Sequence, residues 1–172
     1  GKGTLVTRVR ERRSNLGLTV SATTRAPRKG EVDGVNYFFL TREEFDRRVA
    51  NGEFVEWAEV HGNCYGTLVS EVTSKLASGA SLILEIDVQG ALQVKERFPE
   101  AVLIFIKPPS LEVLRERLVG RGTETPETIE LRMANAADEL ALADRYDDVV
   151  VNDDLDRATD ELVRVLDMHE RI

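Results

Sequence analysis

The sequence predicts an α/β fold in which helices cover both faces of an open parallel sheet. Two runs, residues 81–86 and 102–106, are almost continuously apolar, as in parallel strands that are buried on both faces. Along the chain, strand-like runs alternate with segments of helical periodicity, which is typical of α/β domains. The 172 residues contain no internal repeat and no long linker, which favours a single domain.

The helical segments have apolar residues three and four positions apart, together with recognisable ends. Thr41 and Glu44 form the pattern of a capping box, and the Ser-Gly pair at 78–79 is a helix-ending signal. The predicted helices are residues 1–9, 41–49, 69–76, 91–98, 111–119, 126–143 and 155–166.

The strand segments are short, apolar and rich in β-branched or aromatic residues, and turn-forming residues bound several of them. The predicted strands are residues 18–21, 35–40, 54–60, 81–86, 102–106 and 149–151.

Charge and composition exclude several classes of protein. The net charge is −8, from 23 basic and 31 acidic residues, which argues against an extended nucleic-acid surface. The first 30 residues are nevertheless basic, so a small polyanion is the expected partner; a solvated helix face is the alternative for Arg8 to Arg13. No apolar run approaches the ~18 residues of a membrane span. A single cysteine and the lack of a secretory signal favour the cytoplasm.

The histidines and the cysteine do not suggest a metal centre. His61, His169 and Cys64 supply neither the number nor the spacing of zinc ligands, so structural or solvated positions are expected for them. The acidic pairs at 147–148 and 153–154 are interpreted as turn and helix-start residues.

The chain begins with Gly1, Lys2, Gly3 and Thr4, directly before a predicted helix. Backbone N–H groups at such a helix start can bind phosphate while the lysine reaches its outer oxygens. An ordinary helix start is the alternative interpretation. We expect the strand and the glycine turn that would complete this loop to be missing from the chain.

Several further side chains have the chemistry of a nucleotide site. Arg25 and Arg28 offer planar forks for a phosphate, and Tyr37 and Tyr65 offer hydroxyl groups on rigid rings. The alternative for the two arginines is a loop of solvated charges, and the alternative for the two tyrosines is packing in the core. Asp87 closes an apolar strand, where open α/β sheets place ligands and where a carboxylate can order magnesium; simple capping is the alternative.

Six motifs carry a resemblance that extends over essentially the whole chain. They are SATTRAPRKGEVDGVNYFF from residue 21, EFVEWAEVHGNCYGT from 53, LEIDVQG from 84, KPPS from 107, GRGTET from 120 and VVVNDDL from 149. Together they resemble the guanylate kinases. The resemblance implies a fold of the P-loop kinase type, in which the strand expected before Gly1 is the first central strand of the sheet. It also implies transfer of the γ-phosphoryl group of ATP to GMP or dGMP, with Mg²⁺ and without a covalent intermediate. Without that strand, we expect the 172-residue chain to transfer the phosphoryl group slowly or to fold poorly.

The resemblance also implies roles for particular residues. Glu56 would accept the two adjacent N–H groups of guanine, and the hydroxyls of Ser21 and Thr67 would donate to its carbonyl. The implied GMP site is Ser21, Arg25, Arg28, Glu31, Tyr37, Glu56, Tyr65, Thr67, Glu85 and Asp87. The implied ATP site is Gly1, Lys2, Gly3, Thr4, Arg117, Arg121 and Asn152. The implied catalytic residues are Lys2, Arg121 and Arg132, and the implied Mg²⁺ ligands, partly through water, are Thr4 and Asp87.

The expected domain organisation is one guanylate kinase domain with two added parts. The core is residues 1–21, 81–119 and 136–172, the GMP-binding insertion is 22–80, and a helical lid is 120–135. A non-catalytic guanylate-kinase-like module that binds phosphorylated protein segments is the main alternative. Lys2, Asp87, Arg121 and Arg132 favour the enzyme. Another nucleoside monophosphate kinase is disfavoured by Glu56 with Ser21 and Thr67.

Overall fold

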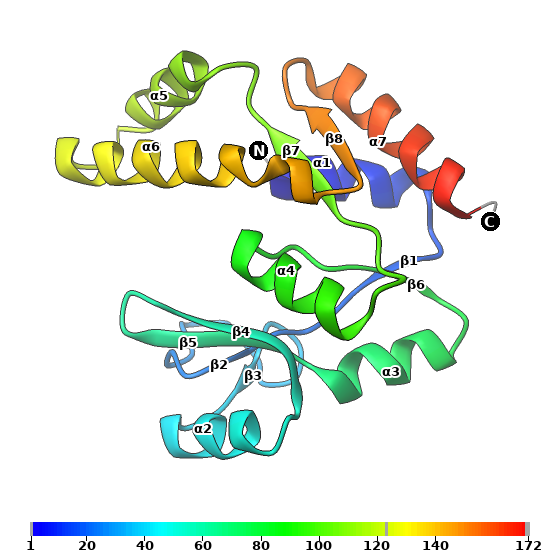
Figure 1. The fold of residues 1–172 in the computed structure, drawn as a ribbon. Helices are drawn as coiled ribbons and strands as arrows, with labels where there is room; N and C mark the ends of the chain where they lie inside the picture. The colour runs from blue at the N-terminus through cyan, green and yellow to red at the C-terminus, as the bar shows by residue number, and fades with distance from the viewer. Residues whose placement is uncertain (1, 123, 171–172) are drawn as a thin grey trace. The chain divides into compact units, whose positions relative to one another are not determined.

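Parallel strand pairs confirm the α/β class. The computed structural model describes residues 2–122 and 124–170 (Figure 1). Strand β1 (Leu16–Leu18) pairs in parallel with β6 (Ser81–Ile83), and β7 (Ile104–Lys107) pairs in parallel with β8 (Asp148–Val151). These pairs lie in different parts of the chain, because residues 13–101 form one compact unit and the described residues outside that range form another.

The predicted helices are present, with bounds that differ by a few residues. They are α1 (Lys2–Arg12), α2 (Arg42–Ala50), α3 (Val69–Ala77), α4 (Val88–Arg97), α5 (Leu111–Gly120), α6 (Pro126–Ala141) and α7 (Leu155–Glu170). A short 3₁₀ turn, η1 (Ala143–Arg145), follows α6. Within residues 2–122 and 124–170, each helix is too short or too polar to span a bilayer.

Side-chain caps explain where several helices begin. Thr41 accepts a hydrogen bond from the Glu44 amide at the start of α2. The capping box is only half made, because the Glu44 carboxylate binds Arg47 and Arg48 instead. Ser110 and Thr125 cap α5 and α6 in the same way. Local sequence therefore specifies these helix starts.

A four-stranded sheet lies within residues 22–68. Its strands are β2 (Ala22–Thr23), β3 (Phe38–Phe39), β4 (Phe54–Val60) and β5 (Asn63–Leu68), in the order β3-β2-β5-β4. Strand β5, absent from our prediction, follows a two-residue turn in which His61 and Gly62 have φ of 51° and 82°. Two positive φ values are the mark of a type I′ hairpin turn, so the glycine after His61 was the available signal.

Both faces of this sheet are covered by helices. On one face, Phe45 of α2 is fully buried against a cluster that includes Phe54 and Cys64. On the other face, Val55 packs with Val72 of α3 and Val94 of α4. Figure 1 shows α2 and α4 on opposite sides of the sheet. The burial of Cys64 confirms its structural interpretation and raises the pKa of its thiol.

Three predicted strands differ from the observed ones. The strand expected at 18–21 ends at Leu18, where its partner β6 also ends, because Leu18 pairs with Ile83. For the same reason the strand expected at 81–86 is shorter. The strand expected at 35–40 is reduced to residues 38–39, because Gly34 has φ of +80° and residues 32–36 form a hydrogen-bonded turn. β-Branched residues in that turn, such as Val35, are exposed rather than paired.

The basic face of α1 has acidic partners within its own unit. Arg8 binds Asp156 and Arg12 binds Asp160, both on α7. The apolar side of α1, with Leu5 and Val9, is fully buried. These two arginines therefore join α1 to α7, which leaves the other basic residues of the N-terminal region as candidates for a polyanion site.

We expect Phe45→Ala to destabilise the sheet unit, because it deletes a fully buried ring that stacks on Phe54 with centroids 4.4 Å apart. Removing a buried phenylalanine costs about 3 to 5 kcal/mol. Urea unfolding followed by the fluorescence of Trp57, the single tryptophan, measures the change. Val35→Ala is the control, since Val35 is 67% exposed; equal midpoints for the two variants would contradict the assigned core.

Candidate functional site

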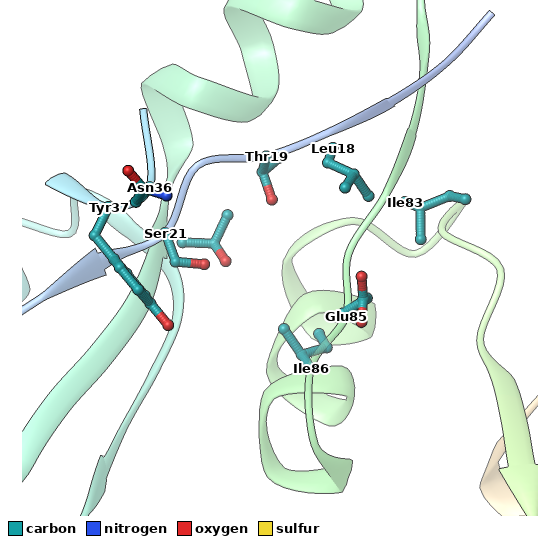
Figure 2. A pocket seen from close by; sticks show the side chains of 9 residues that line it. Leu18, Thr19, Ser21, Asn36, Tyr37, Ile83, Glu85 and Ile86 are labelled. Atoms are coloured by element: carbon teal, nitrogen blue, oxygen red, sulfur yellow. The ribbon is translucent and has the colours of Figure 1, made fainter. Parts of the chain in front are cut away.

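An open pocket lies in the unit formed by residues 13–101. It is lined by Leu18, Thr19, Ser21, Asn36, Tyr37, Thr67, Ile83, Glu85 and Ile86. In Figure 2, Ser21 and Tyr37 lie on one side of the opening, and Glu85 and Ile86 lie on the other. Polar side chains near the four-stranded sheet therefore line one side of the pocket, and apolar and acidic side chains at the end of β6 and after it line the other.

Four of the residues implied for phosphate binding lie together. The Arg25 guanidinium lies over the Tyr37 ring, 5.1 Å from its centroid, and the Tyr37 and Tyr65 rings meet edge to face at 6.3 Å. Glu31 holds Arg25 with two hydrogen bonds of 2.9 and 3.0 Å. The cluster therefore orients a guanidinium beside two phenol rings.

Glu31 also shapes the loop that carries the second arginine. Its Oε1 accepts a 2.7 Å hydrogen bond from the backbone N–H of Arg28, whose side chain is exposed. The Arg25 side chain, followed by the Arg28 amide, holds the pKa of Glu31 down at about 2. The same pair raises the pKa of Arg25, so both groups are charged at neutral pH. Glu31 thus holds both the side chain of Arg25 and the backbone of Arg28 in place.

Glu56 presents a buried carboxylate beside the pocket. Its residue is 7% exposed, and its Oε1 accepts a 2.7 Å hydrogen bond from the hydroxyl of Thr67, which lines the pocket. Burial, and to a lesser degree the charge of Asp87, raise the pKa of Glu56. Thr67 donates its only hydroxyl proton to Glu56, so here it supports the carboxylate rather than offering a donor to the pocket.

The acidic residues after β6 are exposed. Glu85 lines the pocket beyond the end of β6, so its charge does not lie inside a buried strand as the sequence suggested. Asp87 is the N-cap of α4, and its Oδ1 accepts a 2.8 Å hydrogen bond from the Gly90 amide. One carboxylate oxygen of Asp87 thus has a capping role, which moves the start of the predicted helix from 91 to 88.

The segment that leads to Ser21 is held by α3. Glu71 accepts a hydrogen bond from the Val20 amide, and Lys75 donates to the Leu18 carbonyl. An ion pair of 2.6 Å joins Glu71 to Lys75. The pocket side that carries Ser21 is therefore held by α3, and the Ser21 carbonyl also accepts a 2.9 Å hydrogen bond from the Phe38 amide of β3.

The residues implied for ATP lie in the other unit. Arg117 of α5 donates a 3.2 Å hydrogen bond to the carbonyl of Asn152, which follows β8. Gly3 and Thr4 are exposed in the first turn of α1. Gly1 and the side chain of Lys2 lie outside the described part of the chain. The structure thus brings together Arg117 and Asn152.

The two remaining arginines lie on either side of the break between α5 and α6. Arg121 follows α5 with an exposed side chain, and Gly122 has φ of +63°. Arg132 of α6 forms a 2.8 Å ion pair with Glu124. Arg115 and Glu130 join the two helices by a further ion pair. This arrangement places several charges around a glycine turn.

The remaining polar residues have structural roles. His169 binds Asp148 at 2.6 Å, and Asp147 accepts a hydrogen bond from the Leu103 amide. His61 lies in the hairpin turn. Within the described residues, no three His, Cys, Asp or Glu side chains are grouped so as to hold a metal ion.

Comparison with known proteins identifies the family. A guanylate kinase family model matches residues 2–169. The chain belongs to the guanylate kinase family. It is 56% identical to a guanylate kinase of Gloeobacter violaceus and 53% identical to one of Halalkalibacterium halodurans, each over 96% of this chain and 81% of the relative. A crystal structure of guanylate kinase from Anaplasma phagocytophilum matches with a TM-score of 0.75 and 39% identity, over 96% of this chain and 80% of that one.

Two polar residues that line the pocket were not among the site residues predicted from the sequence. Asn36 and Thr19 line the pocket, and neither was singled out. Asn36 closes the turn at 32–36, where its Oδ1 accepts a hydrogen bond from the Val32 amide, so a turn-forming asparagine before Tyr37 was the available signal. Thr19 stood inside a predicted strand, where its type alone indicates nothing about a pocket.

We expect Glu56→Gln to stabilise the ligand-free protein at neutral pH, because it removes a buried charge while keeping the acceptor for Thr67. A carboxyl group whose pKa is raised by folding favours unfolding once pH rises above the unfolded value, near 4.5. The difference between variant and wild type should therefore be smallest below pH ~4, grow as pH rises from the unfolded pKa to the raised folded pKa, and remain constant above that. Urea midpoints from pH 3.5 to 8 measure this; a pH-independent difference would contradict the burial of the charge.

Proposed function

We propose that the chain catalyses transfer of the γ-phosphoryl group of ATP to GMP or dGMP, and that the 13–101 unit binds the acceptor nucleotide. Membership of the guanylate kinase family supports the reaction. The observation that carries the acceptor assignment is the buried Glu56 carboxylate supported by Thr67 beside the pocket.

Glu56 suits guanine in particular. Guanine presents a ring N–H beside an exocyclic amino group, and an ionised carboxylate accepts two such bonds at once. Adenine has no such adjacent pair. Thr67 satisfies Oε1 of Glu56 in the ligand-free site, and Ser21 lines the same pocket. Burial raises the pKa of Glu56 because the carboxylate loses its hydrogen bonds with water. A bound base that donates hydrogen bonds would replace those lost bonds, whereas a base that accepts hydrogen bonds would not.

The acceptor phosphate would lie at the cluster of Arg25, Arg28, Tyr37 and Tyr65. Arg25 is held by Glu31 before any ligand arrives, and Tyr37 reaches the same pocket that Glu56 adjoins. A guanidinium group that is already held in place loses little rotamer freedom on binding. The site is therefore suited to two phosphate oxygens that lie in the plane of the guanidinium group. Base and phosphate would thus be held by one unit of the chain.

The residues implied for ATP would act through position and charge. Arg117 and Asn152, which share a hydrogen bond, would contact the adenine side. Lys2, Arg121 and Arg132 would neutralise the phosphates during transfer. Phosphoryl transfer needs positioning and electrostatic stabilisation rather than a covalent intermediate. The exposed arginine at a glycine turn is suited to a segment, residues 120–135, that closes over the nucleotide.

Magnesium fits the donors that are present. Mg²⁺ is usually held by one or two oxygen ligands together with waters and substrate phosphates, so it needs no cluster of acidic side chains. Asp87 retains a second carboxylate oxygen beside its cap, and the Thr4 hydroxyl is exposed. Each of these groups offers an oxygen that could serve a bound Mg²⁺, directly or through water. When bound, it would screen the charge of the phosphates.

A protein-binding module without catalysis is the second candidate. The exposed Arg28 and the Arg25 cluster would also accept a phosphorylated side chain. A phosphopeptide offers nothing to the buried Glu56, however. Dependence of binding on the base therefore separates the two functions.

We expect Glu56→Gln to lower kcat/KM for GMP and to leave the KM for ATP nearly unchanged, because glutamine places an amide donor against guanine N–H groups. Loss of a hydrogen bond to a charged group costs about 1.5 to 3 kcal/mol, or roughly 10- to 150-fold in kcat/KM. A coupled assay of ADP release, with either substrate saturating, measures both constants. An unchanged kcat/KM for GMP would contradict the proposed recognition of guanine by Glu56.

We expect Arg25→Ala to weaken GMP binding by roughly 10- to 150-fold, the loss of a charged hydrogen bond, while guanosine, which lacks the phosphate, binds as before. Titration calorimetry on the 172-residue chain measures both. Arg47→Ala is the matched control, since Arg47 lies exposed on α2 and pairs only with Glu44 among the described contacts. An equal loss for GMP and guanosine would mean that Arg25 supports the fold rather than the phosphate.

A further inference from the structure

Strand β4 contains an irregularity that decides where Glu56 points. Phe54 pairs with Leu68 and Glu56 pairs with Thr67, so one extra residue, Val55, is accommodated in β4. In a regular strand, Phe54 and Glu56 would face the same side. Such a β-bulge re-aims the side chains that follow it.

The contacts on each side show the effect. Phe54 and Trp57 both meet the Phe45 ring of α2, with centroids at 4.4 and 6.3 Å. Val55 packs with Val94 of α4, and Glu56 faces the first turn of α4. Two successive side chains therefore turn toward α4, which allows a carboxylate to leave the apolar face that Phe54 occupies.

Helix α4 binds the backbone of β4 on both sides of Glu56. The Gln93 amide makes two hydrogen bonds to Trp57, accepting from its N–H at 3.1 Å and donating to its carbonyl at 3.2 Å. Arg97 donates to the carbonyl of Phe54 at 3.1 Å. Strand β4 is the last strand of its sheet, so these side chains supply partners that a further strand would otherwise provide.

Gly90 completes the contact between α4 and Glu56. A Cβ at position 90 would lie 2.7 Å from Glu56 Oε2 and 3.3 Å from Ile86 Cβ. The carboxylate therefore packs against bare helix backbone. Gly90, Gln93 and Arg97 recur at spacings of three and four, so they lie along one face of α4.

We propose that this face of α4 sets the position of the guanine-binding carboxylate, with Gln93 as its main positioning residue. The inference rests on the proposed function of Glu56 and adds residues outside the pocket to base recognition. Gln93 holds the backbone next to Glu56, and Arg97 holds it two residues earlier. Small displacements at such a position are costly, because charged hydrogen bonds need close geometry.

The test compares GMP with inosine monophosphate, whose base lacks the exocyclic amino group that Glu56 would bind. The ratio of their affinities, measured by titration calorimetry on the 172-residue chain, reports the position of the carboxylate and not the phosphate cluster. In Gln93→Met, which keeps the length but loses both hydrogen bonds, we expect this ratio to fall by about tenfold, the size of one hydrogen bond to a charged group. Glu56→Gln, measured alongside, gives the full loss of discrimination.

Gln89→Met is the matched control, because Gln89 is the same residue type on the same helix and has no hydrogen-bond partner among the described residues. It should keep the wild-type ratio. Arg97→Met should also lower the ratio, and Arg97→Lys, which keeps a donor for the Phe54 carbonyl, should restore part of it. These variants test the same face should Gln93→Met fold poorly.

Two results would overturn the proposal and are distinguishable. In the first, Gln93→Met and Arg97→Met keep the wild-type preference for GMP, or they lower the affinities for both nucleotides by the same factor. These residues would then have a structural role only. A wild-type chain that binds both nucleotides equally, and that Glu56→Gln does not alter, would instead remove the guanine recognition on which the inference depends.

Discussion

The burial of the Glu56 carboxylate is the constraint on which the 13–101 unit depends. Glu56 is 7% exposed, so its carboxylate needs partners that replace water, and Thr67 supplies hydrogen bonds from its hydroxyl and its backbone. A bulge in β4, a glycine in α4 and two side-chain anchors from the same helix accommodate it. Burial of this charge raises the pKa of Glu56, and in the proposed site a base that donates hydrogen bonds would relieve that desolvation.

The phosphate end of the same unit follows the opposite principle. Arg25 and Glu31 satisfy one another, and the favourable pair raises one pKa and lowers the other. A ligand phosphate there gains from a guanidinium that is already oriented rather than from the relief of a desolvated charge. In the proposed site, discrimination among bases and affinity for phosphate would therefore rest on separate groups, so each could be altered independently.

The unit that contains α1 and α7 distributes its charges differently. Arg8 and Arg12 serve helix packing through Asp156 and Asp160, whereas Arg121 remains exposed beside a glycine turn. Arg132 is paired with Glu124, so its use toward a nucleotide requires exchange of that partner. If residues 120–135 act as the proposed lid, pairing of Arg132 in the open state suits phosphoryl transfer, in which charge is needed only when the substrates are enclosed.

Local sequence alone determined the helices, since capping residues such as Thr41, Ser110 and Thr125 act within one turn of their own positions. It also determined the family, because the motifs span nearly the whole chain. The strand bounds predicted from the sequence were less accurate than the helix bounds. Leu18 and Ile83 end their strands together because the two segments, distant in sequence, pair with each other. Only the tertiary structure decided that Thr67 donates to Glu56, that Asp87 caps α4 and that Gln93 holds β4. Each of these contacts joins side chains whose partners are chosen by packing, and residue type and spacing do not encode that choice.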